Sequence, residues 1–436
     1  MPEFLRLSPP TEALQTLLRA LPNREPAAEM IDTTTALGRV IAADVCAPHP
    51  LPEFPRATVD GYAVRARDTF GTSESLPGYL TLVGEVPMGD VPAFALIPGA
   101  CAIIHTGGML PVGADAVEML EYSQTIRLVG QLPDPTTEIE IARAVAEGEN
   151  VLCVGEDVSA EQVVLVAGVR VRPAEIGGCM ALGIVKLRVA IKPKIGIISS
   201  GDEVVPPEQS PRPGQVRDVN SYSLAALVEG AGGEPVLFGI VPDSLEVMKN
   251  TAARALTECD VLVITAGSSA SARDMTAETI ASLGEPGVLV HGVNVRPGKP
   301  TILAVCGGKA VIGLPGNPVS ALVIAELFVV PVIEKLLGLK FLRPRATVSA
   351  KLTVNVPSQA GREDWVSIRL LPNYMIPDHL PQSDGVRAMG ETAFLAEPIF
   401  GKSNLIFSLA AAHGLVRIPP DATGLSAGEI VEVVLM

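Results

Sequence analysis

Apolar runs and amphipathic helical patterns alternate from Lys194 to Gly338, and this alternation limits the fold more than any other feature of the sequence. The runs KIGIIS, PVLFGIV and DVLVITAG are typical of buried strands, and each is followed by a helical pattern such as SLEVMKNTAARALTE. Strands that alternate with helices form a largely parallel sheet with helices on its faces. The sequence therefore predicts an α/β domain over residues 189–338.

The remaining residues predict three smaller units, since 436 residues are too many for one ordinary core. The stretch TEALQTLLRAL is helical in pattern, whereas short alternating runs cut by Gly and Pro occupy the region from Tyr62 to about Glu147 and the last hundred residues. We therefore expect a multi-domain α/β plus β protein. Its parts are a discontinuous N-terminal domain (6–47 and 148–188), an inserted β module (48–147), the α/β domain, and a small barrel-like C-terminal β domain (339–436).

Composition excludes several classes of function. A net charge of −15 disfavours a nucleic-acid-binding surface, which needs an excess of Lys and Arg. The six cysteines are scattered, without CxxC or Cys/His clusters, which favours free thiols in a reducing compartment. The sequence has no uncharged apolar run of about 18 residues, and its first residues do not resemble a signal peptide. We expect a cytoplasmic protein without a membrane span.

Four loops that follow predicted strands carry the residues with candidate chemistry. Asp202 and Glu203 lie in SSGDEV, Asp243 in IVPDSLE, Asp274 in TAGSSASARD, and Gly316–Asn317 in GLPGNPVS. In a parallel sheet such loops meet at the carboxyl edge, where ligands bind. Several carboxylates beside free backbone amides predict a site for Mg²⁺ that bridges phosphate groups.

Each of these residues also has a purely structural interpretation. Asp243 with Glu246 forms a D-x-x-E pattern that resembles a capping box, and Asp274 could cap the helix that follows it. Asn317 and Pro318 form the cap and first-turn proline expected at a helix start. Capping and ligand binding are compatible, because a helix N-terminus is itself an anion site.

The loop TAGSSASARDM has only one glycine, Gly267, where phosphate-binding loops usually have several. The hydroxyl groups of Ser268, Ser269 and Ser271, with the backbone amides, could hold a phosphate. Alternatively, these small residues only allow the helix to pack close to the sheet. Alanine and serine adopt positive φ angles at a cost, so the residues alone leave both interpretations open.

Seven motifs together make the sequence resemble the MoeA family of molybdopterin molybdenumtransferases, which is related to the C-terminal part of gephyrin. They are VDGYAVRARDTFG, HTGGMLPVGADAVEMLE, VGEDV, SSGDEVV, GQVRDVNS, RPGKPTI and GLPGNPVSA, and the resemblance extends from about Ser8 to Leu435. It implies an enzyme of molybdenum cofactor biosynthesis that uses adenylylated molybdopterin and molybdate, requires Mg²⁺ and releases AMP. It also implies a homodimer with a site shared between subunits, and a MogA-like partner.

The resemblance also implies roles for particular residues. The catalytic set would be Asp60, Thr106, Glu203, Asp243 and Asp274, of which Glu203, Asp243 and Asp274 would position Mg²⁺. Asp60 and Thr106 would complete the site from the partner subunit. Further substrate contacts would be Gly267, Ser268, Ser269 and Ser271 in the phosphate loop, Asp218 and Asn220 beside the pterin or as a helix cap, Lys299, and Pro315, Gly316, Asn317 and Pro318 in LPGNP.

The sequence departs from the family pattern at several positions. RATVDGYA differs from the usual residues before Asp60, NVLCVGED lacks a common arginine, and Ala266 and Ser271 stand where glycines are usual. An alternative hypothesis is therefore a catalytically weakened paralogue that binds molybdopterin or acts as a scaffold. A third is a MogA-like adenylyl-transfer enzyme, which the additional domains disfavour.

Overall fold

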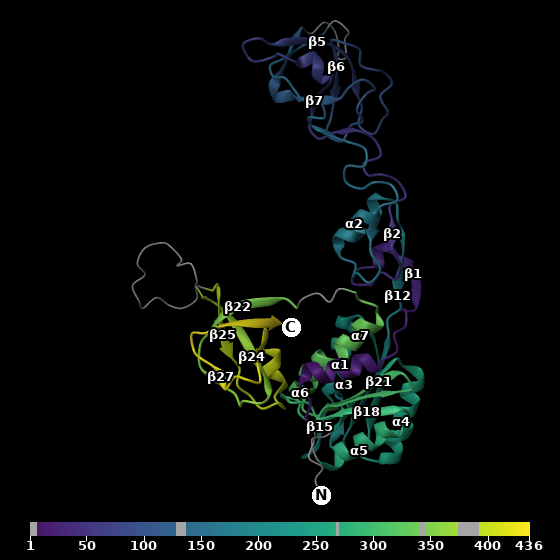
Figure 1. The fold of residues 1–436 in the computed structure, drawn as a ribbon, viewed down its shortest axis with the longest axis vertical. Coiled ribbons are helices and arrows are strands. Elements are labelled where there is room, and N and C mark those ends of the chain that lie inside the picture. The colour runs from purple at the N-terminus through teal and green to yellow at the C-terminus, as the bar shows by residue number, and fades with distance from the viewer. Residues whose placement is uncertain (1–6, 128–136, 267–269, 341–344, 374–391) are drawn as a thin grey trace, which may run out of the picture.

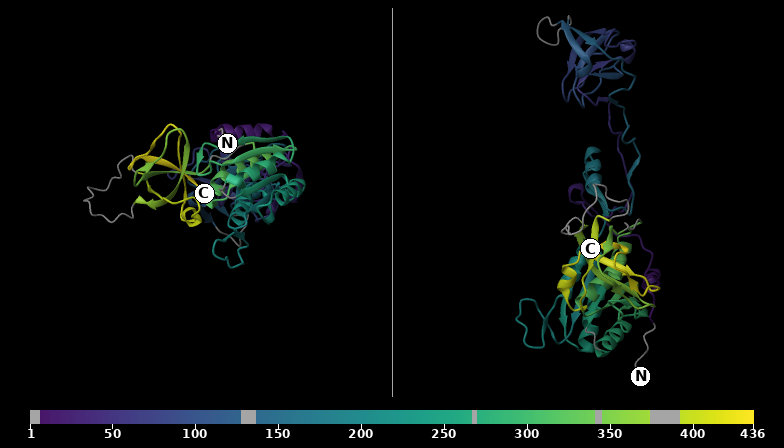
Figure 2. Two further views of the ribbon diagram at one scale, coloured as in Figure 1. Left: turned by 90° about the horizontal axis from the view of Figure 1, so that it is seen from below. Right: turned by 90° about the vertical axis from the view of Figure 1, so that its left-hand side faces the viewer.

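The computed structural model describes residues 7–127, 137–266, 270–340, 345–373 and 392–436, except for the side chains of residues 270–274. The molecule is elongated (Figure 1). The β module lies at one end, the slender N-terminal domain lies in the middle, and the α/β domain and the C-terminal β domain lie side by side at the other end (Figures 1 and 2). No helix among the described residues is long and apolar enough to cross a membrane.

A six-stranded sheet forms the centre of the α/β domain. In spatial order its strands are β16 (Glu234–Val241), β13 (Lys194–Ser200), β17 (Val261–Ala266), β21 (Lys309–Pro315), β20 (Ile302–Cys306) and β18 (Pro286–His291). The first four are parallel, whereas the last two are antiparallel. This confirms the predicted, mostly parallel sheet. A short parallel pair, β14 (Val204–Val205) and β15 (Val216–Arg217), follows β13.

Helices cover both faces of this sheet and bury two apolar cores. One face packs against α3 (Asn220–Ala231) and the continuous segment α6 (Pro318–Ile324), η4 (Ala325–Val329) and α7 (Val330–Leu336), and the other against α4 (Leu245–Glu258) and α5 (Ala270–Ala281). The N-terminal helix α1 (Pro10–Ala20) joins the first of these cores. Ala13, Leu17 and the C-cap residue Leu21 are buried there because their spacing of four residues places them on one side of the helix.

Helix α5 begins earlier than the sequence pattern predicts. A cap at Asp274 would place the start of the helix at Met275, whereas α5 begins at Ala270. The residues between include Ala and Arg but no Gly or Pro, so nothing in them interrupts a helix. Asp274 is therefore inside the helix, and the suggestion that it caps α5 is wrong.

The N-terminal domain is built from segments on both sides of the β module. Its elements are β1 (Ala28–Asp32), η1 (Thr33–Thr35), β2 (Val45–Cys46), β11 (Val163–Leu165), α2 (Pro173–Ala181) and β12 (Lys186–Ala190). β1 pairs with β12, and β2 pairs with β11, each antiparallel. The β module is therefore inserted into a discontinuous domain. Helix α1, which the sequence predicted as part of this domain, packs on the α/β domain instead.

The β module has a six-stranded sheet with an apolar core on each face. Its strands in spatial order are β7 (Ala116–Met119), β4 (Gly61–Val64), β6 (Ala100–Ile104), β5 (Gly78–Val86), β9 (Glu138–Ile141) and β8 (Ser123–Arg127). The antiparallel pair β3 (Arg56–Ala57) and β10 (Val151–Leu152) lies at its base, and η2 (Ala66–Thr69) and η3 (Leu120–Tyr122) follow β4 and β7.

The C-terminal domain is a small closed barrel, as predicted. Its strands are β24 (Glu363–Pro372), β25 (Phe394–Pro398), β22 (Thr347–Leu352), β28 (Ile430–Leu435) and β26 (Gly414–Ile418), and β26 closes the ring by pairing with β24. The domain also contains α8 (Ile406–Ala410) and the pair β23 (Val356–Pro357) and β27 (Gly424–Leu425). A strand of the α/β region, β19 (Val295–Arg296), extends the sheet by pairing with β24.

Candidate functional site

The loops predicted to carry chemistry do meet at the carboxyl edge of the α/β sheet. β13, β16, β17 and β21 are parallel neighbours, so the loops after Ser200, Val241, Ala266 and Pro315 leave the same edge. The backbone N–H of Asp243 donates to Asp202 Oδ1 at 3.1 Å, which joins the first two loops directly. Asp202, Glu203 and Asp243 are thus grouped at this edge, whereas the contribution of Asp274 stays a prediction, because its side chain lies outside the described residues.

The acidic side chains at this edge repel one another. Partial burial raises the pKa of Asp243, and the neighbouring carboxylates of Asp202 and Glu203 raise it further. Gly201 has φ +142°, and a Cβ there would lie 2.7 Å from Glu203 Oε2, so the glycine lets this side chain fold over the loop. Where side chains are described, no group of three His, Cys, Asp or Glu residues is spaced to hold a metal ion.

The capping interpretations have different outcomes. Ser244 is the N-cap residue of α4 and makes no side-chain cap, so the suggested capping box of Asp243 and Glu246 is not formed. Asp218 precedes Val219, the N-cap residue of α3, and its Oδ1 accepts the N–H of Ser221 in the first turn at 3.1 Å. Asn317 is the N-cap residue of α6 with Pro318 next to it, yet its amide makes no cap to the helix.

Asn220 links α3 to the loop that follows β21. Its Nδ2 donates to the carbonyl oxygen of Gly316 at 2.8 Å, while its Oδ1 is buried with no hydrogen-bond partner among the described residues. An unpartnered buried amide oxygen is costly, so this one is suited to accept a hydrogen bond from a ligand group at the strand edge.

The phosphate loop falls largely outside the described residues. Gly267, Ser268 and Ser269 are not described, and Ser271 and Asp274 are placed only by the backbone of α5. Their predicted role in binding phosphate stays a prediction.

Asp60 and Thr106 form a compact pair in the β module. Asp60 Oδ1 accepts the Thr106 N–H at 2.7 Å and the Thr106 hydroxyl at 3.0 Å. The two residues meet because Gly61 of β4 faces Ile104 of β6 in an antiparallel pair. The backbone N–H of Thr106 lowers the pKa of Asp60 most, its hydroxyl adds to this, and His105 makes a smaller contribution in the same direction. Asp60 is therefore an ionised carboxylate with a fixed orientation.

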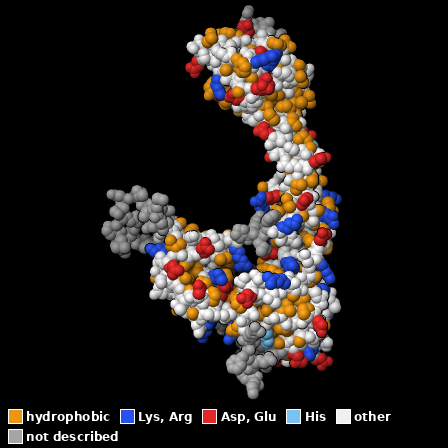
Figure 3. All heavy atoms as spheres, viewed as in Figure 1, with side chains coloured by type: hydrophobic (Ala, Val, Ile, Leu, Met, Phe, Trp, Pro, Cys, Tyr) orange, Lys and Arg blue, Asp and Glu red, His pale blue; other side chains and the backbone are white. Residues whose placement is uncertain are grey.

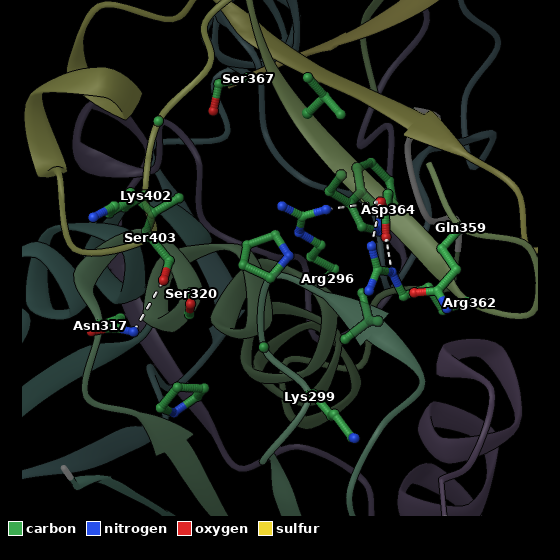
Figure 4. A pocket seen from close by; sticks show the side chains of 18 of the residues that line it. Arg296, Lys299, Asn317, Ser320, Gln359, Arg362, Asp364, Ser367, Lys402 and Ser403 are labelled. Carbon is green, nitrogen blue, oxygen red and sulfur yellow. Dashed lines mark hydrogen bonds and ion pairs between the residues drawn. The ribbon is translucent and has the colours of Figure 1, made fainter. Parts of the chain in front are cut away.

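A cavity of about 900 Å³ lies between the α/β domain and the C-terminal barrel (Figure 4). Lys299, Pro315 and Asn317, which the sequence predicted, lie in its wall. Sequence reasoning did not identify other polar residues in its wall, among them Arg296, Ser320, Arg362, Asp364, Ser367, Lys402 and Ser403. The charged side chains in the wall are four basic ones and one carboxylate, namely Arg296, Lys299, Arg362, Lys402 and Asp364. The cavity therefore has an excess of positive charge, although the protein has a net charge of −15. Tracing basic residues that flank predicted loops could have found Arg362 and Lys402.

An ion pair and a hydrogen bond cross the domain boundary at this cavity. Arg362 Nε donates to Asp364 Oδ1 at 2.7 Å, and Arg296 approaches the same carboxylate from the α/β side at 3.8 Å (Figure 4). On the opposite wall, Asn317 Nδ2 donates to Ser403 Oγ at 3.0 Å. Acidic and basic groups are otherwise interspersed over the visible face of the molecule (Figure 3).

Comparison with known proteins gives matches along almost the whole chain. Residues 8–183 match the model described as MoeA N-terminal region (domain I and II), residues 196–335 the "Probable molybdopterin binding domain", and residues 379–436 the MoeA C-terminal region (domain IV). A molybdopterin molybdenumtransferase from Nostoc is 32% identical, covering 93% of this chain and 88% of the relative. The chain belongs to the MoeA family. A second relative, molybdopterin molybdenumtransferase 2 from Mycobacterium tuberculosis, is also 32% identical, over 92% of this chain and 94% of the relative.

Solved MoeA structures have the same architecture. The crystal structure of a molybdopterin biosynthesis MoeA protein from Pyrococcus horikoshii superposes with a TM-score of 0.81 at 33% identity, covering 99% of this chain and 100% of that one. The family resemblance drawn from the seven motifs is confirmed.

Proposed function

We propose that this chain inserts molybdate into adenylylated molybdopterin and releases AMP in a reaction that depends on Mg²⁺. Membership of the MoeA family, with relatives named molybdopterin molybdenumtransferase, makes the chain a transferase of molybdenum cofactor biosynthesis. The proposal adds the adenylylated substrate, the leaving group and the cation. One observation carries it: an acidic protein gathers four basic side chains around a single cavity beside the strand-end loops.

This cavity would receive the tetrahedral oxyanion. Arg296, Lys299 and Lys402 supply charge, and Ser403 supplies a hydroxyl, a combination suited to molybdate or phosphate oxygens. Lys299→Ala should weaken molybdate binding about tenfold, which corresponds to about 1.4 kcal/mol. Isothermal titration measures this, with Lys351→Ala on the barrel surface as the control. Equal affinity in the two variants would exclude the cavity as the molybdate site.

The acidic edge would hold the cation. Glu203 and Asp243 supply carboxylate oxygens of the kind that Mg²⁺ prefers, and the family resemblance adds Asp274 as a third ligand. Burial and the carboxylates of Asp202 and Glu203 raise the pKa of Asp243, and a bound cation would favour its ionised form. Bound Mg²⁺ would screen the negative charge of the phosphoanhydride. Asp274→Asn should slow turnover strongly without changing the assembly state.

A homodimer with shared sites would unite the two halves of the predicted catalytic set. In one chain the β module, which holds Asp60 and Thr106, lies far from the strand edge of the α/β domain (Figure 1). Both halves can serve one site only if the β module of a second chain approaches that edge. Light scattering should therefore give twice the chain mass, and mixing Asp60→Asn with Asp274→Asn chains should restore part of the activity of either variant.

The central test measures AMP. Purified protein is incubated with adenylylated molybdopterin, Mg²⁺ and molybdate, and AMP is quantified by chromatography. We expect release that requires both molybdate and Mg²⁺. Binding of molybdopterin without any molybdate-dependent AMP would refute this function and favour a binding or scaffold protein.

A further inference from the structure

His105 lies between two carboxylates at the end of β6. Its Nε2 is 3.1 Å from Glu85 Oε1, and its Nδ1 is 4.0 Å from Asp60 Oδ1. The order of the strands brings these three side chains together. β6 lies between β4, which Asp60 directly precedes, and β5, which contains Glu85. Ile104 pairs with Gly61 on one side, so Asp60 lies opposite His105, the residue that follows β6. On the other side Glu85 pairs with Ile103, and residues two apart on a strand share a face, so Glu85 reaches His105 diagonally.

The contact with Glu85 determines what each ring nitrogen can do. An ionised carboxylate only accepts hydrogen bonds. Nε2 must therefore carry a hydrogen atom and donate the hydrogen bond to Glu85. In the neutral ring the lone pair is then on Nδ1, which faces Asp60 across a gap too long for a direct hydrogen bond. The side chains of His105 and Asp60 are 41% and 57% exposed, so a ligand or water can reach this gap.

We propose that His105 is a catalytic residue that accepts the proton of the water that opens the phosphoanhydride, and that Glu85 is the positioning residue that orients its ring. This inference rests on the proposed AMP-releasing function. The water oxygen bonds to the phosphorus on the molybdopterin side, and the bond from that phosphorus to the bridging oxygen breaks. AMP leaves with the bridging oxygen and its electron pair, and the water proton moves to Nδ1 and later to solvent.

Asp60 is less suited to accept that proton. Its Oδ1 already accepts two hydrogen bonds from Thr106, and these hydrogen bonds lower its pKa, which makes it a weaker base. Its role is to orient the substrate and the attacking water. Enzymes commonly activate a nucleophile with a general base that is oriented by a further group, as His105 is by Glu85. Asp60 and Glu85 are the ionisable groups that the described structure places against the ring, one from the β4 side and one from the β5 side.

The test compares AMP release by the full-length wild type, His105→Asn and Glu85→Gln across pH 5 to 8, the range in which histidine usually changes charge. We expect His105→Asn to lower kcat about a hundredfold, the lower end of what a general base contributes, with KM changed less than about twofold. The fall in the wild-type rate at low pH should disappear in this variant. His105→Gly should regain activity when imidazole is added, and Glu85→Gln should lose roughly tenfold.

His49→Asn is the matched control, since His49 also lies near a glutamate, with Nδ1 3.5 Å from Glu53 Oε1, but outside the site. It should behave as wild type. If His105→Asn keeps the wild-type rate and pH profile, or if imidazole restores nothing to His105→Gly, the inference is overturned while the AMP-releasing function stands. If the wild type itself releases no AMP, both are overturned.

Discussion

Arg296 lies opposite Asp364 in a parallel strand pair, and its Nη1 is 3.8 Å from Asp364 Oδ2. The first residue belongs to the region of the α/β domain and the second to the C-terminal barrel. The cavity between the two domains is therefore bounded by a shared sheet, which limits how far the domains can separate. The basic wall of the proposed oxyanion site depends on this contact.

Asp364→Asn should destabilise the boundary between the two domains. Asp364 is almost fully buried and accepts hydrogen bonds from Arg362 and from the hydroxyl of Ser358 at 3.0 Å. Removing its charge weakens its hydrogen bonds and ion pairs with two guanidinium groups that stay partly exposed, so we expect a cost of about 1 to 3 kcal/mol. Urea unfolding measures the loss. Asp421→Asn on the barrel surface is the control, and a change below about 0.5 kcal/mol in Asp364→Asn would contradict the prediction.

Gly298→Ala should distort the loop that presents Arg296 and Lys299. Gly298 has φ +113°, and a Cβ there would lie 2.2 Å from Cγ1 of the buried Ile324, so the loop or the helix must shift. We expect molybdate binding to weaken at least tenfold and the protein to lose about 2 kcal/mol of stability. Gly307→Ala is a matched control, because Gly307 also has a positive φ of +57° but nothing within 4 Å of the added Cβ. Equal molybdate affinity in the two variants would show that the loop tolerates the shift.

The strand-end acids could be predicted from the sequence because local patterns determine them. Asp202, Glu203 and Asp243 directly follow apolar runs, and parallel strands bring such positions to one edge. The start of α5 could not be predicted in the same way. Small residues such as Ala and Ser occur both in loops and in the first turn of a helix. The sequence pattern therefore does not show that the helix already includes Ser271.

The basic cavity was missed for a different reason. Arg362 and Lys402 lie far from Lys299 in the sequence, and the pairing of β19 with β24 brings the two regions together. A two-residue strand has no periodicity to detect, and the register that places Arg296 opposite Asp364 depends on the tertiary structure. The position of α1 is similar, because its apolar face indicates burial without indicating which domain covers it.

Lys309→Met should destabilise the α/β domain through the end of α4. Lys309 Nζ donates to the carbonyl oxygens of Leu256 and Cys259, each at 2.7 Å, and so satisfies acceptors that the helix leaves unpaired. Methionine keeps the length of the side chain but removes the donor, at a cost of about 1 to 3 kcal/mol. Lys249→Met removes an exposed pair with Glu278 at 2.9 Å and should cost less than about 1 kcal/mol. Urea unfolding that ranks the variants in the opposite order would contradict this role.

Glu118→Gln should abolish a pH dependence of the stability of the β module. Glu118 is fully buried on β7, and within the described part of the chain neither carboxyl oxygen has a side-chain hydrogen-bond partner. Burial raises the pKa of Glu118 to about 7, Glu149 raises it less, and Arg143 opposes the shift.

Burial favours the protonated, neutral form of the Glu118 carboxyl group, and this determines the direction of the pH dependence. The folded state holds the proton to higher pH than the unfolded state, so stability is greatest below the unfolded pKa and is lost as the pH rises through the folded one. Between about pH 4.5 and 7 the wild type should lose about 3 kcal/mol, at 1.36 kcal/mol per unit of pKa difference. Glutamine cannot ionise, so the unfolding temperature of Glu118→Gln should be higher than that of the wild type at pH 8 and nearly independent of pH.

Calorimetric unfolding at pH 5, 6, 7 and 8 measures the difference, with the exposed Glu121→Gln as the control that keeps the wild-type slope. Parallel pH curves for Glu118→Gln and the wild type would mean that Glu118 finds a partner or solvent when it ionises.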